Sequence, residues 1–435
     1  MSACAKVNDN SNGYPSKVHK DCTDVKEDSQ TIVLRQPEQL LRQVLGDELT
    51  VLDLRQSSLV PTGENYGSSM LKIDVVVKKK PDAAEERLAL VAKMSPTAAV
   101  LQEWMNVKVS MPKEIYIFKK LIPTYRELQR EVGIAEKDLI DVLPKYYGGR
   151  FSLDPDAREV DFDAALLMEN LKCVGYKSMD RKTGMDYEHA KKALSKLAEY
   201  HALGIAMRIK RPKIFKEARK VIDIIPFDMN IELFANIGET IMQTVCNDSR
   251  MAIHKDLVKK QIDDNKNFEC SYNMEAVEPW LTIHHGDFWV NNIMFKHDKE
   301  GPVDVKFVDF QLTYSCSPMK DLPYFLTASL SIETINNHFE DLIDIYHEKF
   351  IDTLITLKCD TTPFLREEFD KQLRYDSSNQ LYKCMAALKF FTMDTAENNI
   401  DLNDLKQTVV QSKSNTTFID RLCRMIEKFV EKEWL

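Results

Sequence analysis

The sequence predicts an α+β fold with a small, β-rich N-terminal part and a larger, mainly helical C-terminal part. Between residues 50 and 95, apolar and polar residues alternate with a period of two, which is typical of strands. From about residue 185, apolar residues recur at helical spacing instead. The chain has 435 residues, which is too long for one ordinary core and suits two or three packed units.

The N-terminal part is expected to begin after a polar tail. Residues 1–30 contain almost no large apolar side chain, so we expect them to be disordered. The stretch PEQLLRQVLG predicts a short helix with Pro37 at its start and Gly46 at its end. We therefore expect a tail at 1–30, an N-terminal lobe at 31–172 and a helical C-terminal lobe at 173–435.

The N-terminal lobe is predicted to hold a five-stranded sheet and one further helix. The first three strands are expected at 49–60, 68–80 and 87–95. A helical pattern follows at 101–122, and two shorter strands are expected at 143–151 and 163–171.

The C-terminal lobe is predicted to be helical around one small β element. A helix is expected at 185–204, with Asp186 as its N-cap and Gly204 just past its end. Another is expected at 417–435. Between them, residues 293–310 alternate on both sides of the turn DKEGP, which predicts a hairpin within a catalytic segment at 283–311.

The composition is that of a soluble globular protein, with 44% hydrophobic and 29% charged residues. A net charge of −9 argues against a nucleic-acid partner. None of the nine cysteines lies in a CxxC pair, so a zinc site or a disulfide framework is not expected. We expect a cytoplasmic protein without a membrane partner, because neither a signal peptide nor an apolar span is present. The sequence does not indicate the oligomeric state.

Three oxygen-bearing side chains are expected to meet at one end of the hairpin. Asp287 and Asn292 lie just before its first strand, and Asp309 lies at the end of its second. Antiparallel pairing brings these two ends together. Oxygen ligands of this kind suit Mg²⁺, which is commonly held by one or two carboxylates together with substrate phosphates.

The spacing of these residues fits the catalytic loop of kinases. His285, Gly286 and Asp287, with Asn292 five residues after the aspartate, match the pattern His-x-Asp-x4-Asn. Asp309 begins Asp-Phe-Gln, where kinases have a metal-binding Asp-Phe-Gly. The triplet HGD alone is common, but its spacing to Asn292 and the hairpin that ends at Asp309 make it informative.

The predicted N-terminal sheet supplies matching features. Lys93 ends the third predicted strand in LALVAKM, as does the phosphate-binding lysine of kinases. Glu114, on the helix that follows, is the natural partner of Lys93, and Glu103 is a competing candidate.

Two further segments are candidates for nucleotide contacts. Gly63 and Gly67 lie in GENYGS, in the turn where a phosphate-covering loop belongs, although the spacing departs from Gly-x-Gly-x-x-Gly. Met168, Glu169 and Asn170 lie where the linker between lobes would bind adenine. A P-loop motif is absent from the sequence, which excludes a P-loop ATPase.

Other polar and aromatic residues near the motif have simpler explanations. His201 is expected to be a core histidine, and His284 to be structural. We expect His285 to brace the loop, and Asp321 to begin a helix and also to support this loop. Trp289 is expected to pack in the core or to line an acceptor pocket.

Four stretches carry a resemblance to a known family: HHGDFWVNNIMF, VKFVDFQLTYSCSPMKDLPYFL, GENYGS and LVAKMS. Together they resemble the insect ecdysteroid kinase-like family, also called CHK kinase-like, which is related to choline and aminoglycoside kinases. The match runs from about residue 45 to 430 and is strongest over 283–326. The resemblance implies a two-lobed, protein-kinase-like fold that phosphorylates hydroxyl groups of small molecules, ecdysteroids among them.

The resemblance also implies roles and cofactors. Asp287 would be the catalytic base, Asn292 and Asp309 would bind Mg²⁺, and Lys93 would hold the phosphates of ATP. Glu114 would orient Lys93.

The acceptor is expected to be small, because no Ala-Pro-Glu activation segment follows Asp309. The apolar stretch at 224–242 could line its pocket, although core packing explains that stretch equally well. Two alternatives remain open at this point. One is an inactive kinase-like fold that binds a lipophilic ligand or a protein partner, and the other is a kinase for choline or ethanolamine.

Overall fold

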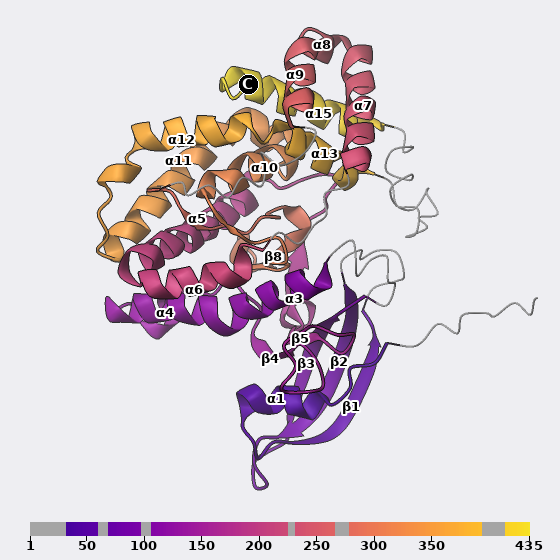
Figure 1. The fold of residues 1–435 in the computed structure, drawn as a ribbon, viewed down its shortest axis with the longest axis vertical. Coiled ribbons are helices and arrows are strands. Elements are labelled where there is room, and N and C mark those ends of the chain that lie inside the picture. Colours follow the sequence, from indigo (N-terminus) through magenta and orange to yellow (C-terminus); the bar gives the residue numbers. More distant parts are fainter. Residues whose placement is uncertain (1–31, 60–67, 97–105, 225–230, 266–277, 394–413) are drawn as a thin grey trace, which may run out of the picture. The chain divides into compact units, whose positions relative to one another are not determined.

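Five antiparallel strands form the N-terminal sheet, in the order β1-β2-β3-β5-β4 (Figure 1). Their bounds are Thr50–Ser58, Ser69–Lys78, Glu86–Met94, Tyr146–Arg150 and Ala165–Glu169 for β1 to β5. Strands were predicted at all five places.

The computed structural model describes residues 32–59, 68–96, 106–224, 231–265, 278–393 and 414–435, and residues 33–435 belong to one compact unit. The predicted tail at 1–30 lies outside the described residues.

The helix predicted between Pro37 and Gly46 is present as α1, Pro37–Leu45, with Gly46 as its C-cap. It lies against the edge strand β4. The contact depends on Gly148, which has a φ of +147°. A Cβ at this position would lie 2.4 Å from the backbone oxygen of Leu40, so only glycine lets the helix backbone approach the strand this closely.

The helix that follows β3 is longer than predicted. Helix α3 spans Val107–Tyr116, a π-helical turn spans Ile117–Leu121, and α4 continues over Ile122–Glu131. The sequence pattern predicted a helix that ends at residue 122. In the structure, Pro123 lies in the first turn of α4, directly after the wider π turn, where a missing N–H is tolerated.

The C-terminal part is mainly helical, as predicted (Figure 1). Helix α5 spans Tyr187–Lys210, and the side chain of Asp186 caps it by accepting a hydrogen bond from the backbone N–H of His189. The other longer helices among the described residues are α6 Pro212–Ile222, α7 Ile231–Asn247, α9 Lys255–Asn265, α10 Asp321–Ala328, α11 Ile332–Thr356, α12 Arg366–Ser378, α13 Leu381–Thr392 and α15 Thr416–Glu431.

The prediction that Gly204 ends α5 was wrong. The helix continues to Lys210, and a Cβ on Gly204 would lie 2.1 Å from the side-chain oxygen of Thr282. Gly204 is therefore needed for close packing against strand β7, Thr282–Ile283, and not for a change of backbone direction.

The predicted hairpin is present. Strand β8, Ile293–His297, pairs with β9, Pro302–Phe307, and Ile293 lies opposite Phe307. A third strand, β6 at Tyr176–Ser178, pairs with the other edge of β8. The register brings the segment before Ile293 next to the segment after Phe307, so the loop with Asp287 and the loop with Asp309 lie at the same end.

No helix in the described ranges is long and apolar enough to cross a membrane.

The N-terminal sheet ends at Glu169, and a 3-10 turn at Leu171–Val174 precedes β6 and α5. The lobe boundary that we predicted between 172 and 173 falls within this turn and remains a prediction.

Candidate active site

Lys93 is the point at which the sheet contacts the loop that follows the hairpin. Its ammonium nitrogen lies 2.7 Å from Glu114 Oε2 and 2.8 Å from Asp309 Oδ1. Lys93 ends β3, Glu114 lies on α3 and Asp309 follows β9, so three separate elements supply this cluster. Glu103, the competing partner for Lys93, lies outside the described residues.

The ion pairs determine which of these groups stays charged. Burial alone lowers the pKa of Lys93, but Asp309 and Glu114 outweigh it, so the pKa of this lysine is raised and it keeps its proton. Burial raises the pKa of the Glu114 carboxyl, and Lys93 opposes this effect. The side chain of Glu114 is only 2% exposed, whereas that of Asp309 is 27% exposed. Asp309 is thus the carboxylate of the cluster that can also contact a ligand.

Asp309 has an unusual backbone conformation, with a φ of +67°. Non-glycine residues seldom adopt the left-handed region, and where they do so the strain often marks a functional site. Oδ1 of this carboxylate accepts from Lys93, and Oδ2 has a long contact of 3.4 Å with Gln311 Nε2. Gln311 occupies the position where kinases have glycine.

Asp287 lies in the loop before the hairpin and accepts two side-chain hydrogen bonds. Asn292 Nδ2 donates to Asp287 Oδ2 over 2.9 Å, and the hydroxyl of Tyr324 donates to Asp287 Oδ1 over 2.9 Å. Asn292 Nδ2 is also 3.0 Å from the backbone oxygen of Asp287. Because the amide nitrogen of Asn292 faces Asp287, its amide oxygen remains suited to a cation.

Burial is the largest effect on the Asp287 carboxyl and raises its pKa, with Asp309 acting in the same direction. Hydrogen bonds from Tyr324 and Asn292, and the positive charge of Lys383, act in the opposite direction. The result is a pKa of about 6 for Asp287. A carboxylate whose pKa lies this close to neutrality is a good general base, because it is mostly ionised at neutral pH and still has appreciable proton affinity.

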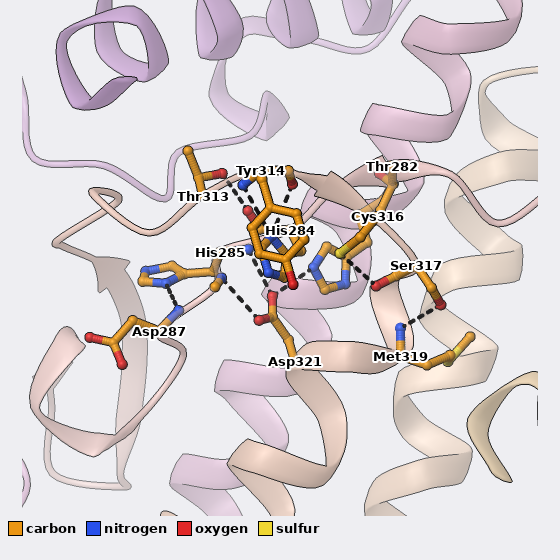
Figure 2. Close-up of polar contacts among 12 residues, drawn as sticks. Thr282, His284, His285, Asp287, Thr313, Tyr314, Cys316, Ser317, Met319 and Asp321 are labelled. Carbon is orange, nitrogen blue, oxygen red and sulfur yellow. Dashed lines mark hydrogen bonds and ion pairs between the residues drawn. The ribbon is translucent and has the colours of Figure 1, made fainter. Parts of the chain in front are cut away.

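Asp321 holds the backbone of the same loop from below (Figure 2). Its Oδ2 accepts from the backbone N–H of His285 over 2.8 Å, and its Oδ1 accepts from the N–H of Gly286 over 3.0 Å. This buried carboxylate also lies 3.2 Å from His201 Nε2. Burial by itself would raise the pKa of Asp321, but the neighbouring histidines, led by His284, hold it below its usual range. Asp321 begins α10 and also supports the catalytic loop, as the sequence predicted.

His285 braces the loop from the other side. Its Nε2 donates to the backbone oxygen of Val308 over 3.1 Å, and its Nδ1 accepts from the N–H of Asp287 over 3.3 Å. These partners require the neutral Nε2–H tautomer. Burial lowers the pKa of His285 to about 4, so the ring stays neutral and does not serve as a proton donor near pH 7.

The other two histidines have structural surroundings. His284 is fully buried, its Nδ1 lies 3.0 Å from the backbone oxygen of Tyr314, and burial lowers its pKa to about 3. His201 lies between Asp321 and the hydroxyl of Tyr346, 2.8 Å from the latter. His201 is therefore the core histidine that the sequence indicated.

The residues suggested for nucleotide binding lie partly outside the described residues, since Gly63 and Gly67 fall in the range 60–67. Met168 and Glu169 end strand β5, and Asn170 caps the 3-10 turn after it. The N–H of Glu169 donates to the backbone oxygen of Lys145, and that of Asn170 to Ala89. An adenine base at this segment would thus contact other backbone atoms than these two N–H groups.

Two residues beside Asp287 were missed at the sequence level: Tyr324 and Lys383. Tyr324 lies three residues after Asp321, so both side chains fall on the same face of α10. The spacing of three residues from Asp321 could therefore have indicated that Tyr324 lies near the loop. Lys383 lies on α13, and nothing in the sequence connects it to the loop nearly one hundred positions earlier.

Trp289 packs face to face on Phe391 of α13, with ring centroids 3.7 Å apart and planes inclined by 6°. Phe288 is buried between Phe307 and Phe325 and belongs to the core.

The donor set fits a hard divalent cation held together with phosphates. The described residues contain no group of three or more His, Cys, Asp or Glu side chains that could hold a metal ion by themselves. Mg²⁺ does not need such a group, since it keeps several water ligands and is often held by one or two carboxylates and substrate phosphates. Asp309, the amide oxygen of Asn292 and the nearby Lys93 match this chemistry.

A family model decides the relationship of this chain to known proteins. The model of the ecdysteroid kinase-like family matches residues 62–359, which is more than half of the chain. The chain belongs to the ecdysteroid kinase-like family. No curated protein matches it.

Several solved structures resemble this ecdysteroid kinase-like chain at low identity. An ethanolamine kinase from Plasmodium vivax is 10% identical, with 86% of this chain and 84% of that one covered and a TM-score of 0.36. A choline kinase from Cryptosporidium parvum is 10% identical over 89% and 92%, with a TM-score of 0.39. A spectinomycin phosphotransferase in complex with ADP and spectinomycin is 8% identical over 88% and 94%, with a TM-score of 0.42. These remote likenesses say nothing about the acceptor of this chain.

Membership of the ecdysteroid kinase-like family confirms the resemblance seen in the four sequence stretches. It also confirms the kinase-like α+β fold, with a β-rich N-terminal part and a mainly helical C-terminal part. The chain is a small-molecule phosphotransferase of the kinase type.

Proposed function

We propose that this chain transfers the γ-phosphoryl group of ATP, with Mg²⁺, to a hydroxyl group of a small molecule, an ecdysteroid or another steroid or xenobiotic. The observation that carries the proposal is one cluster of polar groups from both parts of the fold. Lys93 bridges Glu114 and Asp309, while Asp287 and Asn292 are joined by a hydrogen bond at the same end of the hairpin.

Asp287 is the proposed base. Its pKa of about 6 means that it is mostly ionised at neutral pH and can accept the proton of an incoming hydroxyl. Tyr324 and Asn292 each donate to one of its oxygens, which fixes the carboxylate in place. The backbone of this loop is held by Asp321 through the N–H groups of His285 and Gly286, so the base stands on a rigid support.

Lys93 and Asp309 are proposed to receive the nucleotide. The raised pKa of Lys93 keeps its positive charge available for the phosphates, and Glu114 holds its ammonium group in position. Asp309 and the amide oxygen of Asn292 would hold Mg²⁺, which when bound neutralises charge on the transferring phosphoryl group. Catalysis would then consist mainly of positioning and charge neutralisation.

The remaining nucleotide contacts belong to the proposal as well. Gly63 and Gly67 would cover the phosphates, and the segment Met168 to Asn170 would contact adenine through backbone atoms other than the N–H groups of Glu169 and Asn170. We also propose a cytoplasmic location and an N-terminal lobe at 31–172 that binds the nucleotide.

One experiment tests the proposal directly. The protein is incubated with Mg-ATP and a panel of ecdysteroids, plant sterol glycosides, choline, ethanolamine and aminoglycosides, and each acceptor is examined by mass spectrometry for the gain of one phosphate. Asp287→Asn is run in parallel and is expected to reduce transfer by a factor of about 10² to 10⁴. An unchanged rate in the variant would refute the assignment of the base. If no acceptor is phosphorylated and Mg-ATP does not raise the melting temperature, the protein is an inactive kinase-like fold instead.

A further inference from the structure

Three aromatic rings extend from the proposed base. The hydroxyl of Tyr324 donates to Asp287, and its ring lies edge-on to Phe391, with centroids 5.9 Å apart and planes inclined by 77°. Phe391 in turn stacks on Trp289. The rings come from α10, α13 and the catalytic loop. Aromatic faces next to a catalytic base can bind either an apolar acceptor or, through cation–π attraction, a quaternary amine.

A cation of the protein itself already lies over the ring nearest to Asp287. The ammonium nitrogen of Lys383, on α13, is 5.2 Å from the centroid of the Tyr324 ring. It is also 3.4 Å from the backbone oxygen of Gly286, the residue before Asp287. Lys383 thus contacts both the backbone of the catalytic loop and the ring that donates to the base.

The charge of Lys383 acts on Asp287. Burial and Asp309 raise the pKa of the Asp287 carboxyl, whereas Lys383 is among the groups that lower it. Any acceptor whose hydroxyl reaches Asp287 comes close to this ammonium group, because Lys383 contacts the residue before Asp287 and the ring whose hydroxyl donates to Asp287. In choline and ethanolamine, the positive nitrogen is only two carbon atoms away from the reacting hydroxyl.

We propose that Lys383 determines acceptor specificity by excluding cationic alcohols from the site. This inference rests on the proposed phosphotransfer to a hydroxyl held at Asp287. A quaternary or protonated amine would meet a positive charge at the place where a cation-binding site needs an open aromatic face or a carboxylate. An uncharged acceptor meets no such repulsion and can make apolar contact with the partly exposed ring of Trp289.

Lys383 could instead serve only to brace the loop through the Gly286 oxygen. The two roles differ in a measurable way. A bracing residue affects every acceptor alike, because the loop is common to all reactions. A residue that selects by charge changes the ratio of kcat/KM between a cationic and a neutral acceptor.

The test compares Lys383→Met, which removes the charge at similar length, with Lys383→Arg, which keeps it. Lys389→Met is the matched control, because Lys389 lies on the same helix with its ammonium 5.0 Å from the ring of Phe418, away from Asp287. For each protein, kcat/KM is measured with choline and with an ecdysteroid. We expect the choline-to-ecdysteroid ratio to rise at least about tenfold in Lys383→Met and to stay unchanged in the other two variants.

A second readout does not require turnover. Choline binding in the presence of Mg-ADP is measured by calorimetry, and we expect Lys383→Met to bind choline at least about tenfold more tightly than the parent. If neither the ratio nor the choline affinity changes in Lys383→Met, the inference is overturned, even where ecdysteroids are phosphorylated. It is likewise overturned if the parent protein phosphorylates choline as efficiently as an ecdysteroid. A parent that phosphorylates nothing contradicts the proposed function, and the binding measurement then still decides the role of Lys383.

Discussion

Removal of Lys93 is expected to make the stability of the protein strongly dependent on pH. In Lys93→Met, the carboxyl of Glu114 stays buried but loses its cation. A buried carboxylate without a partner destabilises the folded state by about 3–5 kcal/mol, unless it takes up a proton. Protonation sets an upper limit to this penalty, because the neutral acid can be buried at much lower cost.

The limit follows from the ordinary pKa of glutamate, about 4.3, and from about 1.4 kcal/mol per pH unit. Near pH 7, protonation of Glu114 costs about 3.7 kcal/mol, and near pH 5.5 it costs about 1.6 kcal/mol. In the variant, the pKa of Glu114 is higher in the folded than in the unfolded state, so the folded state binds the proton more tightly. Burial already raises the pKa of Glu114 in the parent, and removal of Lys93 raises it further, so about 2 kcal/mol is the upper limit of what the variant should regain relative to the parent as the pH falls from about 7 to about 5.5.

The assay is urea unfolding of the parent, Lys93→Met and Lys93→Met/Glu114→Gln at both pH values. The double variant has no buried carboxylate at this position, so its deficit in unfolding free energy should be equal at the two pH values. Lys306→Met is a matched control, because it removes another buried lysine from a strand. Its partner Asp141 has a side chain that is 62% exposed and stays hydrated, so we expect no such pH dependence. A deficit of Lys93→Met that is the same at both pH values would refute the reasoning.

Three further predictions concern the catalytic loop. The kcat/KM of the parent should rise with pH through about 6, because Asp287 must lose its proton to act as the base, and Tyr324→Phe should move this midpoint to higher pH by removing a hydrogen bond that lowers the pKa of Asp287. Asp321→Asn should lower the free energy of unfolding by about 3 kcal/mol in urea titrations, because an amide cannot accept from both backbone N–H groups of the loop. Asp309→Asn should raise the Mg²⁺ concentration needed for half-maximal stabilisation by ATP in a thermal melt.

Each of these predictions has an outcome that contradicts it. A pH profile that is identical in Tyr324→Phe would mean that the hydroxyl does not affect the titrating base. A stability of Asp321→Asn within about 0.5 kcal/mol of the parent would mean that its hydrogen bonds to the loop are not important in solution. An unchanged Mg²⁺ requirement in Asp309→Asn would exclude this side chain as a metal ligand.

Several elements of the fold were predictable because local patterns agree with the tertiary structure. The alternation in β2 reflects a strand whose alternate side chains are buried, whereas β1 has no buried residue and the second half of β3 is buried on both faces. Two local signals failed. Gly204 was predicted to follow the end of α5 but is needed for contact with Thr282, and the helix after β3 continues past its predicted end at residue 122 through a π turn. In both cases the packing partner or the preceding backbone, and not the residue type, decided the outcome.

The sequence by itself determined the five strands of the N-terminal sheet, the hairpin and the spacing that joins Asp287, Asn292 and Asp309, because a turn and antiparallel pairing act over short distances. It also contains the stretches that identify the family. Only the tertiary structure decided that Lys93 reaches both Glu114 and Asp309, that Asp321 supports the loop through backbone N–H groups, and that Lys383 lies over Tyr324. These contacts join residues far apart in the chain, and burial and charge at such contacts arise only when the chain is folded.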